Sequence, residues 1–134
     1  MRRRRFGRGA CVLLACALPF GAAAAQSDFP FDRELLLDVS PMKGSKRVPL
    51  IGIGANGAAE IDLWCNSVKA QLVIAGDTIT VITGPMTERA CAPERVQADQ
   101  DMMAALSEVT NWRREGDALI LSGGKTLRFR LQTN

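Results

Sequence analysis

The 134-residue chain contains no histidine. Ser-His-Asp and Cys-His catalytic arrangements both need an imidazole as the general base, so the sequence excludes these two classes of hydrolase. Carboxylate pairs do not replace them. Glu60 and Asp62 alternate along a predicted strand and are typical of a solvated face, while Asp99 and Asp101 diverge around a predicted helix. We therefore expect no enzyme and no catalytic residue.

Long apolar runs are also scarce, and the longest, Ala10–Ala25, falls short of the roughly 20 residues that span a membrane. Five arginines precede this run, and it ends in Ala23-Ala24-Ala25, an A-x-A cleavage site. This arrangement predicts a cleaved signal peptide over residues 1–25 and a mature protein that begins near Gln26. We expect a bacterial protein that is periplasmic or secreted and has no membrane span.

Leu13-Leu14-Ala15-Cys16 resembles a lipobox and leaves an alternative, in which Cys16 carries a lipid anchor. The apolar run continues past Cys16, however, where a lipoprotein normally turns polar. The sequence thus favours cleavage near Ala25 over lipidation.

Cleavage removes the excess of positive charge. The whole chain has 17 basic and 14 acidic residues, and five of the basic residues lie in the signal peptide. The remaining 12 against 14 give a net charge of −2, which offers no electrostatic case for nucleic-acid binding. About 109 residues remain, which suffice for one domain. We expect a polar lead-in over residues 26–33 and a single domain over residues 34–134.

Cysteine is scarce as well, because only Cys65 and Cys91 survive cleavage before Gln26. In an oxidising compartment these two residues allow one intramolecular disulfide, which would stabilise the fold by about 3–4 kcal/mol. Two free, buried thiols are the alternative. A metal site is disfavoured because two thiolates without histidine do not form a tetrahedral zinc site, and the spacing is not that of a C-x-x-C redox pair. We expect no cofactor and no metal.

Apolar residues of the mature chain alternate with period two, which is typical of strands. Gly76-Asp77 and Gly116-Asp117 each separate two such segments and predict two-residue hairpins. One helix is expected from Pro93 to Val109, since proline suits a first helical position. The predicted strands are 34–39, 48–53, 59–65, 69–75, 78–83, 111–115, 118–122 and 126–131, with a turn at Gly84-Pro85. The fold class is therefore α+β, a strongly curled antiparallel meander of about seven or eight strands with one packed helix.

Helical spacing places Val96, Met103, Leu106 and Val109 on the buried side of the helix and Asp99 and Asp101 on its wet side. Gly52-Ile53-Gly54-Ala55-Asn56-Gly57 formally matches the dinucleotide-binding pattern G-x-G-x-x-G. That pattern requires a following helix, and the following residues alternate as a strand instead. We interpret these glycines as a turn or bulge between two strands.

From about Ile61 to Leu131 the chain resembles the META domain (HslJ-like) family of bacterial envelope proteins. The resemblance rests on Cys65-Asn66, on Thr87 with Ala90-Cys91, on the helix before Val109 and on the two closing strands. Trp64 and Arg89 depart from the glycine and methionine of the family pattern. The resemblance implies a compact β-rich fold with one helix and an association with stress, resistance or secretion phenotypes. It implies no catalytic residues.

These observations favour a non-enzymatic periplasmic or secreted protein that binds another envelope protein or supports the envelope under stress. Two alternatives stay open. One is a small disulfide-bonded inhibitor or binding module, similar to lysozyme inhibitors, which a protruding loop with serine and lysine near Met42–Arg47 would favour. The other is a carrier of an apolar ligand, which an internal cavity of several hundred cubic ångströms would favour.

Overall fold

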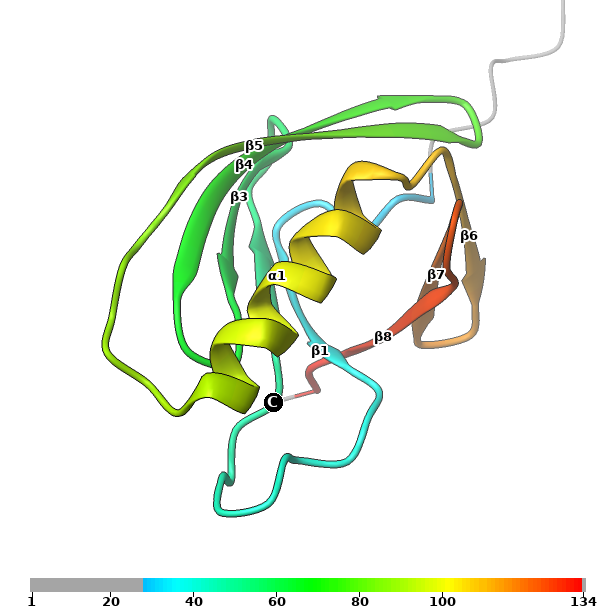
Figure 1. The fold of residues 1–134 in the computed structure, drawn as a ribbon. Coiled ribbons are helices and arrows are strands. Elements are labelled where there is room, and N and C mark those ends of the chain that lie inside the picture. Colours follow the sequence, from blue (N-terminus) through cyan, green and yellow to red (C-terminus); the bar gives the residue numbers. More distant parts are fainter. Residues whose placement is uncertain (1–27, 134) are drawn as a thin grey trace, which may run out of the picture.

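The computed structural model describes residues 28–133. The predicted signal peptide, its cleavage site before Gln26 and the alternative lipid site at Cys16 lie outside the described residues. Within residues 28–133 the chain forms eight strands and one helix (Figure 1). The elements are β1 (Arg33–Leu37), β2 (Leu50–Ile53), β3 (Ala58–Asp62), β4 (Ser67–Ala75), β5 (Thr78–Met86), α1 (Pro93–Ser107), β6 (Asn111–Glu115), β7 (Ala118–Ser122) and β8 (Leu127–Leu131).

The eight strands are antiparallel, follow sequence order and close into a barrel, because β8 pairs with β1. The predicted α+β class is confirmed, and the barrel is a more specific architecture than the curled meander that the sequence indicates. The seam between β5 and β6 is short, with Thr78 and Asn111 as its one pair of register partners. Figure 1 shows α1 crossing between the β3–β5 side and the β6–β8 side of the barrel. The helix therefore completes the wall that β5 and β6 leave open.

The barrel interior is packed with apolar side chains. Leu35, Ile61 and Phe129 are fully buried on the strands, and Leu106 of α1 is 1% exposed. Phe29, in the predicted polar lead-in, is also buried and packs edge-on against Trp112 at a centroid distance of 5.1 Å. Because these side chains occupy the interior, the helix and the sheet share one hydrophobic core.

Both predicted hairpins are confirmed: Gly76 and Gly116 adopt a φ of 60°, as two-residue turns require. Of the three glycines of the apparent dinucleotide pattern, Gly54 and Gly57 lie in the connection of β2 and β3, as interpreted, whereas Gly52 lies inside β2. Gly57 has a φ of 81°, and a Cβ atom there would lie 2.3 Å from the carbonyl oxygen of Leu72. The glycine pattern therefore serves a tight turn that passes close to β4.

The predicted turn at Gly84-Pro85 is wrong, because both residues lie inside β5. Between Thr83 and Met86 this strand uses three residue steps where β4 uses two, from Ala70 to Val68, so the pairing is irregular there. Glycine and proline are tolerated at such a bulge, which explains the misleading turn signal. The helix begins at Pro93 as predicted but ends at Ser107 rather than Val109.

Candidate functional site

The strongest polar cluster surrounds Asp99 of α1. The sequence predicts that this carboxylate lies on the solvent-exposed side of the helix. That prediction is wrong, because Asp99 is 0% exposed. Its Oδ1 accepts hydrogen bonds from the backbone N–H groups of Trp64 at 2.8 Å and Cys65 at 3.1 Å. Its Oδ2 accepts one from the N–H of Asn66 at 2.7 Å. Asp99 thus holds α1 against the connection between β3 and β4.

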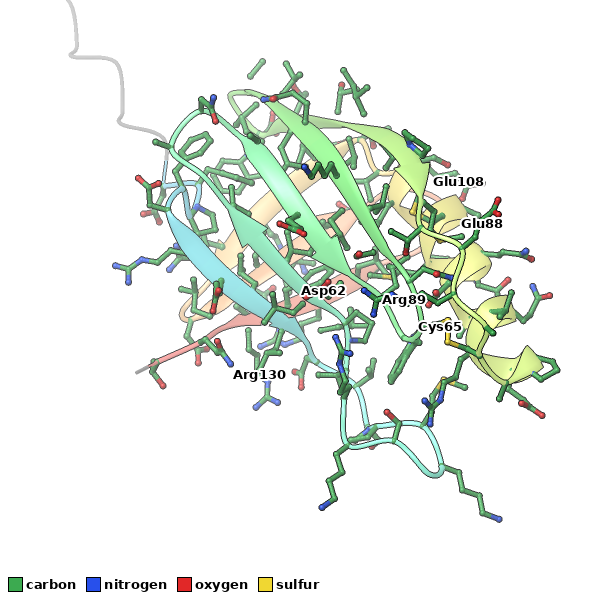
Figure 2. The ribbon with its side chains drawn as sticks, turned by 90° about the vertical axis from the view of Figure 1, so that its left-hand side faces the viewer. Asp62, Cys65, Glu88, Arg89, Glu108 and Arg130 are labelled. Carbon is green, nitrogen blue, oxygen red and sulfur yellow. A yellow bond between two sulfur atoms is a disulfide. The ribbon has the colours of Figure 1, made fainter. Side chains whose placement is uncertain are left out.

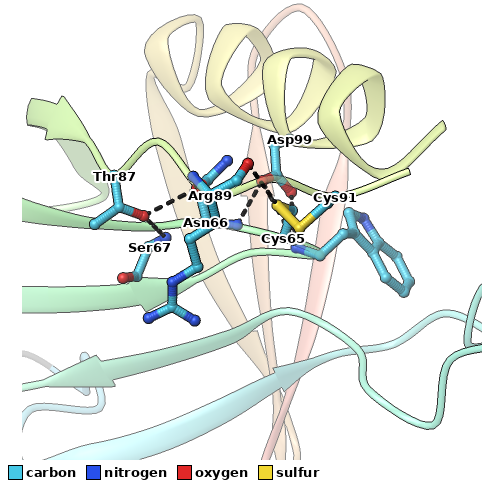
Figure 3. Close-up of a disulfide and its surroundings, with 8 residues drawn as sticks. Cys65, Asn66, Ser67, Thr87, Arg89, Cys91 and Asp99 are labelled. Carbon is cyan, nitrogen blue, oxygen red and sulfur yellow. Dashed lines mark hydrogen bonds between the residues drawn. A yellow bond between two sulfur atoms is a disulfide. The ribbon is translucent and has the colours of Figure 1, made fainter. Parts of the chain in front are cut away.

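Asn66 continues the network towards the segment that leads from β5 to α1. Its Oδ1 accepts hydrogen bonds from the backbone N–H of Arg89 at 2.7 Å and from the hydroxyl of Thr87 at 3.1 Å. The Thr87 hydroxyl oxygen in turn accepts the N–H of Ser67 at 3.0 Å (Figure 3). The side chains of Asn66 and Thr87 therefore join two segments that are about 20 residues apart in sequence.

The predicted disulfide between Cys65 and Cys91 is present, with a Cα–Cα distance of 6.1 Å and a sequence separation of 26 (Figure 3). It connects the same two segments as Asn66 does. Ala90 lies beside it and is exposed. We refer to Cys65, Asn66, Thr87, Cys91 and Asp99 as the motif cluster, because four of these residues also carry the family resemblance.

The buried polar side-chain atoms of the motif cluster all form hydrogen bonds within the protein. Within residues 28–133 no buried side-chain nitrogen or oxygen lacks a hydrogen-bond partner. In the same range no group of three or more cysteine or carboxylate side chains is placed to hold a metal ion. All hydrogen bonds to Asp99 run within the protein, from the β3–β4 connection to α1. The cluster therefore acts as a scaffold at this end of the barrel.

Several exposed features surround this scaffold. The β1–β2 connection, through Gly44, and the β3–β4 connection, through Cys65, both contact the start of α1 or the segment just before it. A shallow groove of about 290 Å³ lies there, and Val39, Trp64 and Met102 are among its lining residues. Val39 is 45% exposed and Trp64 is half-buried. We call this region the loop end of the barrel.

The loop end also carries the long β1–β2 connection, residues 38–49, which extends away from the barrel (Figure 1; Figure 2 shows it below the labelled Cys65). Lys43, Lys46 and Arg47 are exposed on it. A protruding loop at this position is the feature that would favour the inhibitor or binding-module alternative, and the β1–β2 connection protrudes from the barrel.

A second surface groove, about 630 Å³, lies away from the motif cluster. It is lined by residues from the start of the described chain, such as Phe29 and Arg33, together with Arg114 and Leu131. Arg114 donates to the carbonyl oxygens of Gly116 at 2.9 Å and Asp28 at 3.3 Å, so its guanidinium is already bonded within the protein. The first described residues form part of the wall of this groove, and none of the motif residues lines it.

Among the described residues, Glu115 on the barrel surface has a lowered pKa. Glu115 receives hydrogen bonds from Arg113 at 3.0 Å and Arg128 at 2.9 Å, and these lower its pKa below the ordinary value of 4.5. Arg128 also lies 3.3 Å from Asp38, which pairs with Arg130 at 3.0 Å. These ion pairs link β6, β8 and Asp38, the residue that follows β1, on the outside of the barrel.

Residues 36–134 match the META domain family, so the chain belongs to this family, as the resemblance predicts. A protein from Burkholderia xenovorans, solved by NMR, has a similar fold with a TM-score of 0.62. The two share 18% sequence identity over 87% of this chain and 98% of that protein. A second NMR structure has a TM-score of 0.60 at 21% identity and covers 75% of this chain and 89% of the other.

At these identities, the two structures show the shared fold alone. No curated protein matches the chain. Among the elements described in residues 28–133, no helix has the length and apolar character that crossing a membrane requires.

Proposed function

We propose that this META-domain protein is a non-enzymatic binding protein that works outside the cytoplasm, as an accessory or stress-response component of the bacterial envelope. The observation that carries the proposal is that the buried polar groups of the motif cluster are already hydrogen-bonded within the protein. Asp99, the fully buried carboxylate, is bonded to three backbone N–H groups of its own chain. The disulfide between Cys65 and Cys91 supports an oxidising compartment.

The loop end is the binding surface in this proposal. Its groove combines a half-buried Trp64 with the exposed Val39. Partly exposed tryptophan side chains in apolar surroundings often contribute much of the binding energy of protein interfaces. Directly beneath Trp64, the hydrogen bond from its backbone N–H to Asp99 fixes the backbone. A fixed anchor loses less conformational entropy when a partner binds, and this supports the loop end as the contact surface.

An inhibitor of an envelope or extracellular enzyme is a second candidate, and the exposed β1–β2 loop is the observation that favours it. The carrier hypothesis has less support, because Leu35, Ile61 and Phe129 fill the barrel interior where an apolar ligand would need space. The surface grooves instead lie outside the packed core.

Affinity capture with matched variants tests the proposal. The mature, oxidised protein is immobilised and exposed to periplasmic extract, and the retained proteins are identified by mass spectrometry. Trp64→Gly introduces the residue of the family pattern and removes the proposed anchor. Ile82→Ser is the control, because Ile82 is 55% exposed on β5, outside the groove. We expect Trp64→Gly to lose a retained protein that Ile82→Ser keeps. Identical retention by all three proteins would contradict the proposal.

A further inference from the structure

The β1–β2 loop concentrates positive charge on a chain whose mature part is expected to be acidic overall. Lys43, Lys46 and Arg47 lie within five residues and are all exposed, and no acidic residue occurs from position 39 to position 49. Arg95, at the start of α1, adds a fourth cation beside the loop tip. The loop tip is therefore locally basic, and Glu94 is the acidic residue that lines the same small groove as Lys43 and Arg95.

These four cations are left without ion pairs, in contrast to three arginines of β6 and β8. Arg113, Arg128 and Arg130 each lie within 3.3 Å of a carboxylate oxygen. Within residues 28–133 none of the four loop-end cations forms such a pair. Unpaired charges of one sign on a protruding loop attract a surface of opposite sign and raise the rate of association with it.

The loop tip has a defined conformation. The N–H of Ser45 donates to the carbonyl oxygen of Met42 at 2.9 Å, and Gly44 between them has a φ of 78°. The hydroxyl oxygen of Ser45 accepts the N–H of Arg47 at 3.1 Å. Arg95 donates from Nη2 to the carbonyl oxygen of Gly44 at 3.0 Å and so ties the tip to α1. A loop held in this way presents its cations with little further ordering upon binding.

We propose that the loop-end cations dock into an acidic, concave face of a partner protein. This inference rests on the proposed function and specifies the chemistry of its partner. A narrow, rigid loop fits a concavity, and its charges are then surrounded by the carboxylates of the partner. An anionic membrane instead favours a broad basic face with several apolar side chains that insert. Of the exposed large hydrophobic residues in the described chain, only Val39 lies on this loop, and Val73 and Ile82 lie on β4 and β5.

The test compares the mature, oxidised protein with two charge-reversal variants of equal net charge. Lys43→Glu/Lys46→Glu reverses the charge of two lysines on the loop. Arg33→Glu/Lys69→Glu reverses the charge of two exposed cations on β1 and β4. Each protein is used for capture from periplasmic extract at low and high salt, with a deca-glutamate peptide as competitor. Binding to phosphatidylglycerol vesicles is measured by sedimentation.

We expect a retained acidic protein whose affinity falls at least about tenfold in Lys43→Glu/Lys46→Glu but not in the control variant. Deca-glutamate and high salt should both displace it. Retention that survives the loop reversal but is lost in Trp64→Gly would overturn this inference and leave the proposed function intact. Equal retention by every variant would overturn both. If the vesicles bind the protein in a charge-dependent way and no protein is retained, the inference of a protein partner would be overturned, and an anionic membrane would be the binding partner.

Discussion

Replacement of Asp99 by asparagine should destabilise the barrel strongly, although the two side chains have nearly the same shape. Asp99 is 0% exposed and accepts the N–H groups of Trp64, Cys65 and Asn66 at 2.7–3.1 Å. In Asp99→Asn one accepting oxygen becomes an NH₂ group. At least one backbone N–H then loses its acceptor in a buried site, which costs about 1–3 kcal/mol, and the remaining bonds lose their charge assistance. We expect a total loss of about 2–4 kcal/mol in the free energy of unfolding.

Urea unfolding of the oxidised protein, followed by tryptophan fluorescence, measures this loss. Asp101→Asn is the matched control, because Asp101 lies on the same helix but is exposed and accepts only the side chain of Gln97. We expect the control to change stability by less than about 0.5 kcal/mol. A loss of that small size in Asp99→Asn as well would refute the structural role of this carboxylate.

Three further predictions concern other contacts. Cys65→Ala/Cys91→Ala should lose about 3–4 kcal/mol, seen in calorimetry as a lower melting temperature, and reduction of the wild type should give a similar loss. An unchanged melting temperature would contradict this role. Arg113→Gln should raise the pKa of Glu115 back towards 4.5 in an NMR titration, since the bond from Arg113 is the main cause of the lowered value. Because the folded-state pKa is lowered, the stabilisation from Glu115 is present above about pH 4.5 and is lost as the pH falls through the folded-state pKa. If Glu115 titrates in Arg113→Gln as it does in the wild type, the result would contradict the pairing. Gly57→Ala should unfold at lower urea concentration than Gly44→Ala. Both positions have positive φ, but only at Gly57 would the added methyl group clash with a backbone carbonyl oxygen, that of Leu72, so equal midpoints would refute the close approach.

Local sequence signals predicted most of the strands, because their evidence lies within a few neighbouring residues. Gly76-Asp77 and Gly116-Asp117 mark the hairpins directly, and Pro93 marks the helix start. The disulfide followed from the number of cysteines that remain after cleavage. Barrel closure was beyond this reasoning, since the pairing of β1 with β8 joins residues about 95 positions apart.

The burial of Asp99 was missed because an aspartate on a helix is normally assigned to the solvent. Its donors, the N–H groups of residues 64–66, lie more than 30 positions away in sequence. A signal was nevertheless present. Asp99 follows Val96 by three residues and precedes Met103 and Leu106 by four and seven. The spacing that assigns those three residues to the buried side therefore includes Asp99 as well, and its assignment to the solvent side rested on its charge alone. A charged residue on the buried side of a helix indicates a buried polar contact rather than a wet face.

The central claim is that the motif cluster is an internal scaffold, and backbone amide hydrogen exchange at Trp64, Cys65 and Asn66 tests it most directly. These three N–H groups lie outside the strands but donate to the buried carboxylate of Asp99. The account predicts that they exchange as slowly as amides of the barrel strands, and that Asp99→Asn accelerates all three. Exchange of these amides in the wild type at the rate of an exposed loop would contradict the account.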